Sequence, residues 1–183
     1  MSENMLVLHC SPTLAGIKTG NLFSCPANDF EKLKRCIRAL NRGLSRKGLR
    51  IIPLNCKKGR ALIYVYRPNF LKRDFCNSET CEILNGCGYK CENAEACVAK
   101  LAKRLRHTDD FPHEIGLFLG YPPEDVKGFI ENKAEHYKCV GHWKVYGDEQ
   151  KAKKLFAKYE KCTKLYCEQW ANGNTIERLT VAV

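Results

Sequence analysis

The chain has 183 residues, with 31 lysines and arginines against 20 aspartates and glutamates, and therefore a formal net charge of +11 at pH 7. No apolar run approaches the roughly 20 residues of a membrane-spanning helix, and the opening MSENMLVLHC lacks the basic segment of an export signal. The sequence thus excludes a membrane protein and predicts a cytoplasmic protein whose residues 1–183 form a single globular domain.

The first half of the sequence predicts a loop, a helix and a β-hairpin. An apolar run, Met5–Cys10, is short enough for a strand or for one helical turn, and the small residues that follow it up to Asn21 indicate a loop. Asp29 is expected to cap an amphipathic helix that ends near Lys47, since apolar residues recur there at helical spacing. Two strands then flank a turn rich in lysine and glycine, and the second strand, which is apolar throughout, should be central. These strands are Leu49–Leu54 and Arg60–Tyr66.

The second half is predicted to be mostly helical. Pro68–Gly86 is expected to be helical with one internal break, and Asn93 to cap a helix that continues to about His107. Asp148 should cap the longest helix. Two further strands are predicted, Trp143–Tyr146 and Thr175–Val183. In this order the elements predict an α+β fold, in which about six helices cover a small mixed or antiparallel sheet of about four strands.

Residues 111–130 (FPHEIGLFLGYPPEDVKGFI) hold the densest mixture of apolar residues, glycines and prolines. Pro112 fits the first turn of a helix. Asp109 and Asp110 precede it, and their carboxylates can accept hydrogen bonds from the free N–H groups of that turn. Gly120 should end that helix, and the two prolines after it should begin a second one. We therefore expect two short helices around a rigid Gly-Tyr-Pro-Pro corner. Their buried apolar residues should include Phe118, Leu119 and Phe129.

Three blocks of this sequence resemble a known family. They are the 111–130 block, the WKVYGD of Trp143–Asp148, and the earlier CSPTLAGIKTGNLFSC of Cys10–Cys25. Together they are similar to a family of uncharacterised proteins from anaerobic Gram-positive bacteria, described only as a domain of unknown function. The resemblance covers nearly the whole chain. It implies no catalytic residues, because none is established for that family.

The early loop is the first candidate ligand site. Backbone N–H groups around Gly16 and Gly20, with Lys18 and Thr19 beside them, could cradle an anion. The number of residues between the glycines and the lysine does not match the P-loop motif. Cys10 precedes the loop and is a candidate reactive thiol, because loop amides and a lysine favour the thiolate. The structural alternative is an ordered loop without a ligand.

His113 and Glu114 form the second candidate ligand site. A histidine in the first turn of a helix stays neutral, and a neutral imidazole can serve as a base or as a ligand to a metal or haem. The structural alternative is that His113 donates to a nearby carbonyl group while Glu114 compensates the helix dipole. We predict that this pair and the early loop meet on one side of the sheet. They would form the main ligand pocket, with Cys10 and His113 as its reactive or ligating groups.

Twelve cysteines are a third feature. In a reducing cytoplasm they are not expected to form a disulfide framework, which leaves apolar packing, metal ligation and reactive thiols. The candidate metal ligands are Cys81, Cys87, Cys91 and Cys97. Their spacing matches neither a zinc ribbon nor a ferredoxin motif. The structural alternative is that Cys81 and Cys97 face the core while the other cysteines lie in loops and have no function. A second candidate group is His136, Cys139 and His142, whose side chains would lie on different faces of an extended segment.

These features support three hypotheses about function. The first is a metal- or redox-linked binding or accessory protein with cysteine and histidine ligands, for which a transition metal, an iron–sulfur cluster or haem is the candidate cofactor. The second is an enzyme that acts on an anionic small molecule through Lys18, Cys10 and His113. The third is a basic adaptor for a protein or nucleic acid, and the absence of any nucleic-acid-binding motif argues against the latter. The expected partners are thus an anionic small molecule or a redox partner protein, and not a membrane.

Overall fold

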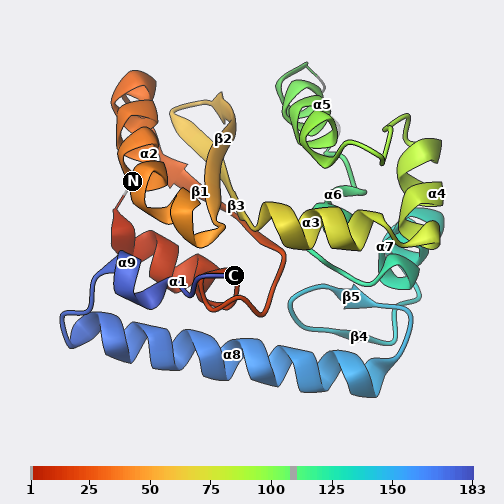
Figure 1. Cartoon of the computed structure of the whole chain (residues 1–183). Coiled ribbons are helices and arrows are strands. Elements are labelled where there is room, and N and C mark those ends of the chain that lie inside the picture. Colours follow the sequence, from red (N-terminus) through yellow and green to blue (C-terminus); the bar gives the residue numbers. More distant parts are fainter. Residues whose placement is uncertain (1, 108–110) are drawn as a thin grey trace.

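The structure is a computed structural model that describes residues 2–107 and 111–183 (Figure 1). Within these residues the helices are α1 (Glu3–Leu14), α2 (Phe30–Leu44), α3 (Pro68–Phe75), α4 (Ser78–Gly86), α5 (Ala94–His107), α6 (Ile115–Phe118), α7 (Pro123–Glu131), α8 (Glu149–Ala171) and α9 (Ile176–Leu179), with a 3-10 turn, Ser45–Lys47, after α2. The strands are β1 (Gly20–Pro26), β2 (Arg50–Lys57), β3 (Arg60–Tyr66), β4 (Cys139–Val140) and β5 (Lys144–Val145). The predicted α+β class is confirmed. No helix in this part of the chain is both long and apolar enough to cross a membrane.

The main sheet has three antiparallel strands in the order β1-β3-β2, and β4 and β5 form a separate antiparallel pair. The apolar strand β3 is central, as its sequence predicts. The predicted hairpin is confirmed too: β2 and β3 are joined through Lys58 and Gly59, which both have positive φ angles. Two such residues match the right-handed twist of the flanking strands.

Local capping signals account for the helices that the sequence predicts best. Asp29, Asn93 and Asp148 each accept a hydrogen bond from the backbone N–H group three residues further along the chain. Gly48 and Gly173 follow the ends of their helical segments with positive φ angles, which only glycine adopts without strain. The predicted helices after Asp29, Asn93 and Asp148 are therefore confirmed.

The two faces of the main sheet are covered by different helices. Alternate residues of β3 divide between two apolar cores, because successive side chains of a strand point to opposite faces. Ile63 and Val65 pack with α1, α2 and α9, whereas Tyr64 and Tyr66 pack with α3, α5 and α6. A third, smaller core joins Trp143 near β5 to α8. In Figure 1, α8 runs past α1 at one end and past β4 and β5 at the other.

Two predictions at the ends of the chain are wrong. Met5–Cys10 is neither a strand nor a single turn, and the loop predicted after it begins only after Leu14, because Glu3–Leu14 is one helix. This helix is buried on several sides, so it lacks the polar face that marks an amphipathic helix. Thr175–Val183 is not a strand. Thr175 caps a short helix there, and Ile176 and Leu179, three residues apart, bury on one side of it.

The predicted pair of short helices around a glycine–proline corner is present as α6 and α7, with Phe118 and Leu119 buried. Phe129 is only half-buried, because it lies at the edge of a groove against the His113 ring. The first helix begins at Ile115, so Pro112 precedes it and does not form its first turn. Asp109 and Asp110, the expected capping residues, lie outside the described residues.

A buried arginine fixes the chain around the turn that follows α1. Arg67 donates hydrogen bonds to four backbone carbonyl groups: those of Thr13, Leu14, Lys47 and Val181. Carbonyl groups at helix ends carry partial negative charge, so these hydrogen bonds stabilise the buried guanidinium group. The interaction holds together the end of α1, the end of the α2 segment and the C-terminal tail. It thereby sets the position of residues 15–19, which lead into β1.

Candidate ligand-binding cleft

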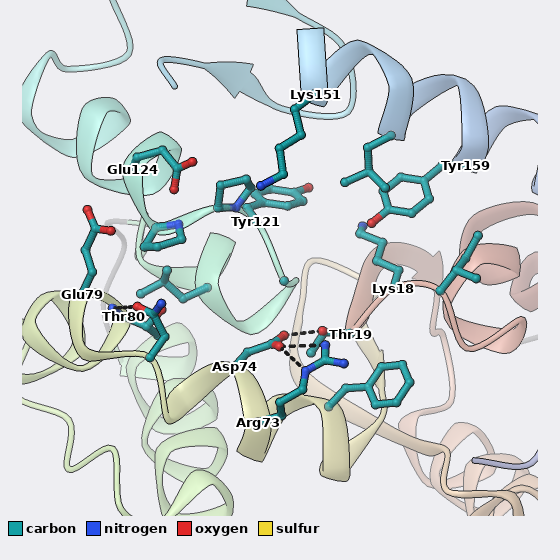
Figure 2. Close-up of a pocket in the computed structure, with 18 of the residues that line it drawn as sticks. Lys18, Thr19, Arg73, Asp74, Glu79, Thr80, Tyr121, Glu124, Lys151 and Tyr159 are labelled. Carbon is teal, nitrogen blue, oxygen red and sulfur yellow. Dashed lines mark hydrogen bonds and ion pairs between the residues drawn. The ribbon is translucent and has the colours of Figure 1, made fainter. Parts of the chain in front are cut away.

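A cleft of about 560 Å³ opens between the largest and the smallest of the three apolar cores. Its walls are the turn between α1 and β1, the helix α3 with the start of α4, the corner between α6 and α7, and the first half of α8. Figure 2 shows its polar side chains converging from these four elements. The fold brings these side chains together because α8 crosses from α1 to the β4–β5 pair and forms the fourth wall of the cleft.

Lys18 is the most unusual side chain of this cleft. Gly16, with φ at +70°, reverses the chain after α1, and the Lys18 N–H group donates to the Pro12 carbonyl group. The side chain is only 5% exposed. Its Nζ atom lies 5.2 Å from the ring centre of Tyr121 and 5.7 Å from that of Tyr159. These aromatic faces attract a cation, but they provide neither a carboxylate nor a hydrogen-bond acceptor.

Within residues 2–107 and 111–183 the Lys18 ammonium group forms no hydrogen bond and no ion pair. Burial therefore lowers the pKa of Lys18 to about 8, an effect that the nearby Cys10 thiol only partly opposes. Burial of the His142 ring lowers the pKa of His142, and the positive charge of Lys18 lowers it further. A lysine in this state exchanges its proton easily near neutral pH.

Thr19, Asp74 and Arg73 form a connected polar floor beside Lys18. The Thr19 hydroxyl donates to Oδ2 of Asp74, and Oδ1 of the same carboxylate accepts from Nε and Nη2 of Arg73 at 3.1 and 2.9 Å. Gly120 packs directly against this floor. A Cβ atom at Gly120 would lie 2.8 Å from the Thr19 side chain, and φ there is +76°. Glycine is thus required at the corner for the approach of α6 and α7 to the cleft floor.

The charges of the cleft are not evenly distributed. Figure 2 shows Lys18 and Tyr159 at one end, Glu79 and Glu124 at the other, and Tyr121 between them. Lys151 extends from α8 above Tyr121. The cleft therefore offers a buried positive group at one end and carboxylates at the other, so a bound molecule would meet opposite charges at its two ends.

The comparisons with known proteins identify the family. A family model described as a protein of unknown function, DUF3793, matches residues 6–180. The chain belongs to the DUF3793 family. No curated protein and no solved structure matches it.

The structure of this DUF3793 protein brings some of the predicted site residues together and separates others. Gly16, Lys18 and Thr19 all line the cleft. Cys10 lies in the core behind them, where burial raises the pKa of its thiol far above the ordinary value. His113 lies in a different pocket. Cys10 and His113 thus line no common pocket among the described residues.

His113 lines an apolar groove of about 390 Å³ between α6, α7 and the β4–β5 pair. Its ring packs against Phe129, with ring centres 5.0 Å apart. Tyr121 lines both this groove and the cleft, so it forms the wall between them. Asp125 supports this wall: it accepts from the Trp143 indole and from the backbone N–H groups of Tyr146 and Gly147.

Glu114 is part of a buried structural network. Its Oε1 atom accepts a hydrogen bond from the Tyr89 hydroxyl at 2.8 Å and pairs with Nη1 of Arg104. Burial, followed by the Glu114 carboxylate, raises the pKa of the Tyr89 phenol. The carboxylate therefore joins α5 to the start of α6, and it lines neither the cleft nor the groove beside His113.

The four candidate metal cysteines are arranged as a disulfide and two separate thiols. Cys81 on α4 is bonded to Cys91, which precedes α5. Cys87 is half-buried against the core, and the Cys97 thiol donates to the Lys90 carbonyl group at 3.1 Å. Residues 2–107 and 111–183 contain no group of three or more His, Cys, Asp or Glu side chains placed to hold a metal ion. His136, Cys139 and His142 form no such group either.

The sequence reasoning missed most of the residues that complete the cleft. They are Arg73, Asp74, Glu79, Tyr121, Glu124, Lys151 and Tyr159. Tyr121 lies in the glycine–proline corner, whose unusual composition is a usable signal in the sequence. Tyr159 lies on the apolar stripe of α8 and is expected from its spacing to be a core residue. No local pattern distinguishes such a tyrosine from one that borders a cleft.

Proposed function

We propose that this DUF3793 protein binds a small anionic molecule in the cleft, with Lys18 as the group that receives its negative charge. The observation that carries the proposal is a buried ammonium group that faces the cleft without an anionic partner in the described residues. Burial of an unpaired charge costs several kcal/mol. A carboxylate or phosphate in the cleft would offset this cost, and Lys151 and Arg73 would add to the attraction.

The opposite end of the cleft suggests a second property of the ligand. Glu79 and Glu124 accept hydrogen bonds or attract cations, and they lie away from Lys18 (Figure 2). A molecule with an anionic group at one end and an amino or other donating group at the other would satisfy both ends. The volume, about 560 Å³, is in the range of pockets that bind small metabolites.

Titration calorimetry with glycolate, inorganic phosphate and glutamate tests this proposal. We expect at least one of these anions to bind the wild-type protein, and Lys18→Met to weaken that binding by about tenfold or more, because a buried charge–charge contact is worth more than 1.4 kcal/mol. Lys154→Met is the matched control. Lys154 is exposed on α8 but does not line the cleft, so its loss should leave the affinity unchanged.

Equal affinity of the wild-type and Lys18→Met proteins for every anion that binds would contradict the proposal. An equal loss of affinity in Lys154→Met would do so as well, because it would reduce the effect to that of net charge.

A redox-linked role is a second candidate, and the Cys81–Cys91 bond is the observation that favours it. In a cytoplasmic protein, which the sequence predicts, a disulfide is typically transient and belongs to a catalytic or sensing thiol pair. The exposed Cys76 lines the same surface pocket as the two bonded cysteines. A redox partner protein could therefore approach all three sulfur atoms from one side.

A further inference from the structure

The Lys18 amine is held in a position from which it can react as well as attract. Its aliphatic stem is enclosed by the packed residues around the cleft, and its Nζ atom is at the cleft wall without a hydrogen-bond partner in the described part of the chain. Lys151 also lines the cleft, but its side chain is exposed. The two lysines therefore differ in burial while sharing access to the same bound molecule.

Several titratable or charged groups surround the Lys18 amine. They are Cys10 from α1, Arg73 and Asp74 from α3, Tyr121 from the α6–α7 corner, His142 from the β4–β5 turn, and Tyr159 from α8. Asp74 is the one carboxylate among them, and it is engaged by Thr19 and Arg73. Nothing in this set holds the proton on Lys18 firmly. Consequently a large fraction of the amine is neutral at a pH of about 8, and only the neutral amine is a nucleophile.

We propose that Lys18 forms an imine with the carbonyl group of a small anionic aldehyde or 2-oxo acid bound in the cleft, an inference that rests on the proposed binding function. The Nζ lone pair adds to the carbonyl carbon and gives a carbinolamine. The carbinolamine then loses water, which carries away the carbonyl oxygen and the two amine hydrogens, and a C=N bond remains. The step consumes no oxidant or reductant.

Tyr159 is placed to assist the loss of water. Figure 2 draws its hydroxyl group at the same end of the cleft as the Lys18 amine. Burial raises the pKa of Tyr159 to about 12, so the phenol stays protonated and can donate a proton to the departing oxygen. The phenol makes no side-chain hydrogen bond within residues 2–107 and 111–183, which leaves it available for this role.

Reductive trapping with glyoxylate, the smallest anionic aldehyde, tests the inference. Wild-type protein is incubated with glyoxylate and cyanoborohydride at a pH of about 8, and the added carboxymethyl groups are located by peptide mass spectrometry. We expect Lys18 to be modified about tenfold or more faster than Lys151 or any other lysine. Lys18→Met should lose the dominant modification, and Lys154→Met should keep it.

Binding of glycolate separates this inference from the proposed function, because glycolate has the same carboxylate but no carbonyl group. Modification spread evenly over exposed lysines would overturn the inference. Calorimetric binding of glycolate and glyoxylate without an adduct on Lys18 would also overturn it, while leaving the binding function in place. Failure of glycolate, phosphate, glutamate and glyoxylate to bind, together with absence of the adduct, would overturn both the inference and the proposed function.

Discussion

At the scale of single residues, Lys18 is where the proposed binding function and the stability of the fold are opposed. The structure places an ammonium group among apolar and aromatic side chains, and the fall of its pKa from 10.5 to about 8 measures the cost of doing so. That shift corresponds to about 3 kcal/mol of lost stability while the group is charged. Side chains that reduce stability in this way are concentrated at binding and catalytic sites. The buried charges with structural roles in this fold, Arg67 and Glu114, have hydrogen-bond partners.

Lys18→Met should therefore stabilise the protein, and the gain should depend on pH. Below a pH of about 8, Lys18 is protonated in both the folded and the unfolded chain, so the full cost of burial is present. As the pH rises from about 8 to 10.5, the folded lysine is neutral while the unfolded one still binds a proton, and the wild-type protein gains stability. We expect Lys18→Met to raise the free energy of unfolding by as much as about 3 kcal/mol at neutral pH, and by much less near pH 10.

Urea unfolding of both proteins, followed by circular dichroism, measures this difference. Only the change of this free-energy difference with pH is diagnostic, because the packing of the methionine side chain does not depend on pH. A difference that stays constant from neutral pH to about pH 10 would show that the Lys18 amine is not a buried, unpaired charge.

At the scale of elements, α4 and the segment before α5 are joined by the Cys81–Cys91 bond. The two cysteines are separated by 10 positions, and closing a loop of that length restricts the unfolded chain by about 2–3 kcal/mol. Helix α4 also supplies Glu79 and Thr80 to the acidic end of the cleft. The oxidation state of this bond is therefore linked to the element that forms one end of the proposed binding site.

Differential alkylation tests the redox candidate. After purification without reductant, we expect Cys81 and Cys91 to resist iodoacetamide and Cys76 to react, since it is exposed. A dithiol reductant should make the thiols of Cys81 and Cys91 reactive towards iodoacetamide and lower the free energy of unfolding by about 2–3 kcal/mol. Cys76→Ser is the control and should keep the bond. Rapid alkylation of Cys81 and Cys91 in the absence of reductant would remove the support for a redox role.

At the scale of the whole molecule, the cleft lies between the largest and the smallest of three apolar cores. Ile17, Tyr121 and Leu155 pack against the smallest core, while Leu117 belongs to the largest. Helix α8 continues past them and packs against the core around α1 through Tyr166 and Trp170. The polar side chains occupy the space that these cores leave at their junction.

The sequence predicts the parts of this architecture that depend on local signals. Asp29, Asn93 and Asp148 mark helix starts through their own side-chain hydrogen bonds, and the β2–β3 hairpin follows from two strands and a short turn. Helix α1 escapes prediction because tertiary packing buries it on several sides and removes its periodicity. The C-terminal segment alternates in polarity and is mistaken for a strand.

The candidate site is predictable only in part, for a related reason. The sequence indicates Gly16, Lys18 and Thr19 because polar and small residues interrupt an apolar context there. Their partners come from α3, α4 and α8, which are brought together only by the fold. The prediction that Cys10 and His113 share a pocket requires knowing which faces of two distant segments meet in the fold. The spacing of residues within either segment holds no information about that.

The pKa of Lys18 tests the central claim most directly. In protein labelled with ¹³C at the lysine Cε atoms, the Lys18 signal, assigned by its absence in Lys18→Met, can be followed by NMR as a function of pH with and without glycolate. The structure predicts a midpoint of about 8 for the free protein and a higher midpoint when the anion binds, because an adjacent negative charge favours the protonated amine. A midpoint above about 10 that does not respond to glycolate, phosphate or glutamate would contradict the account.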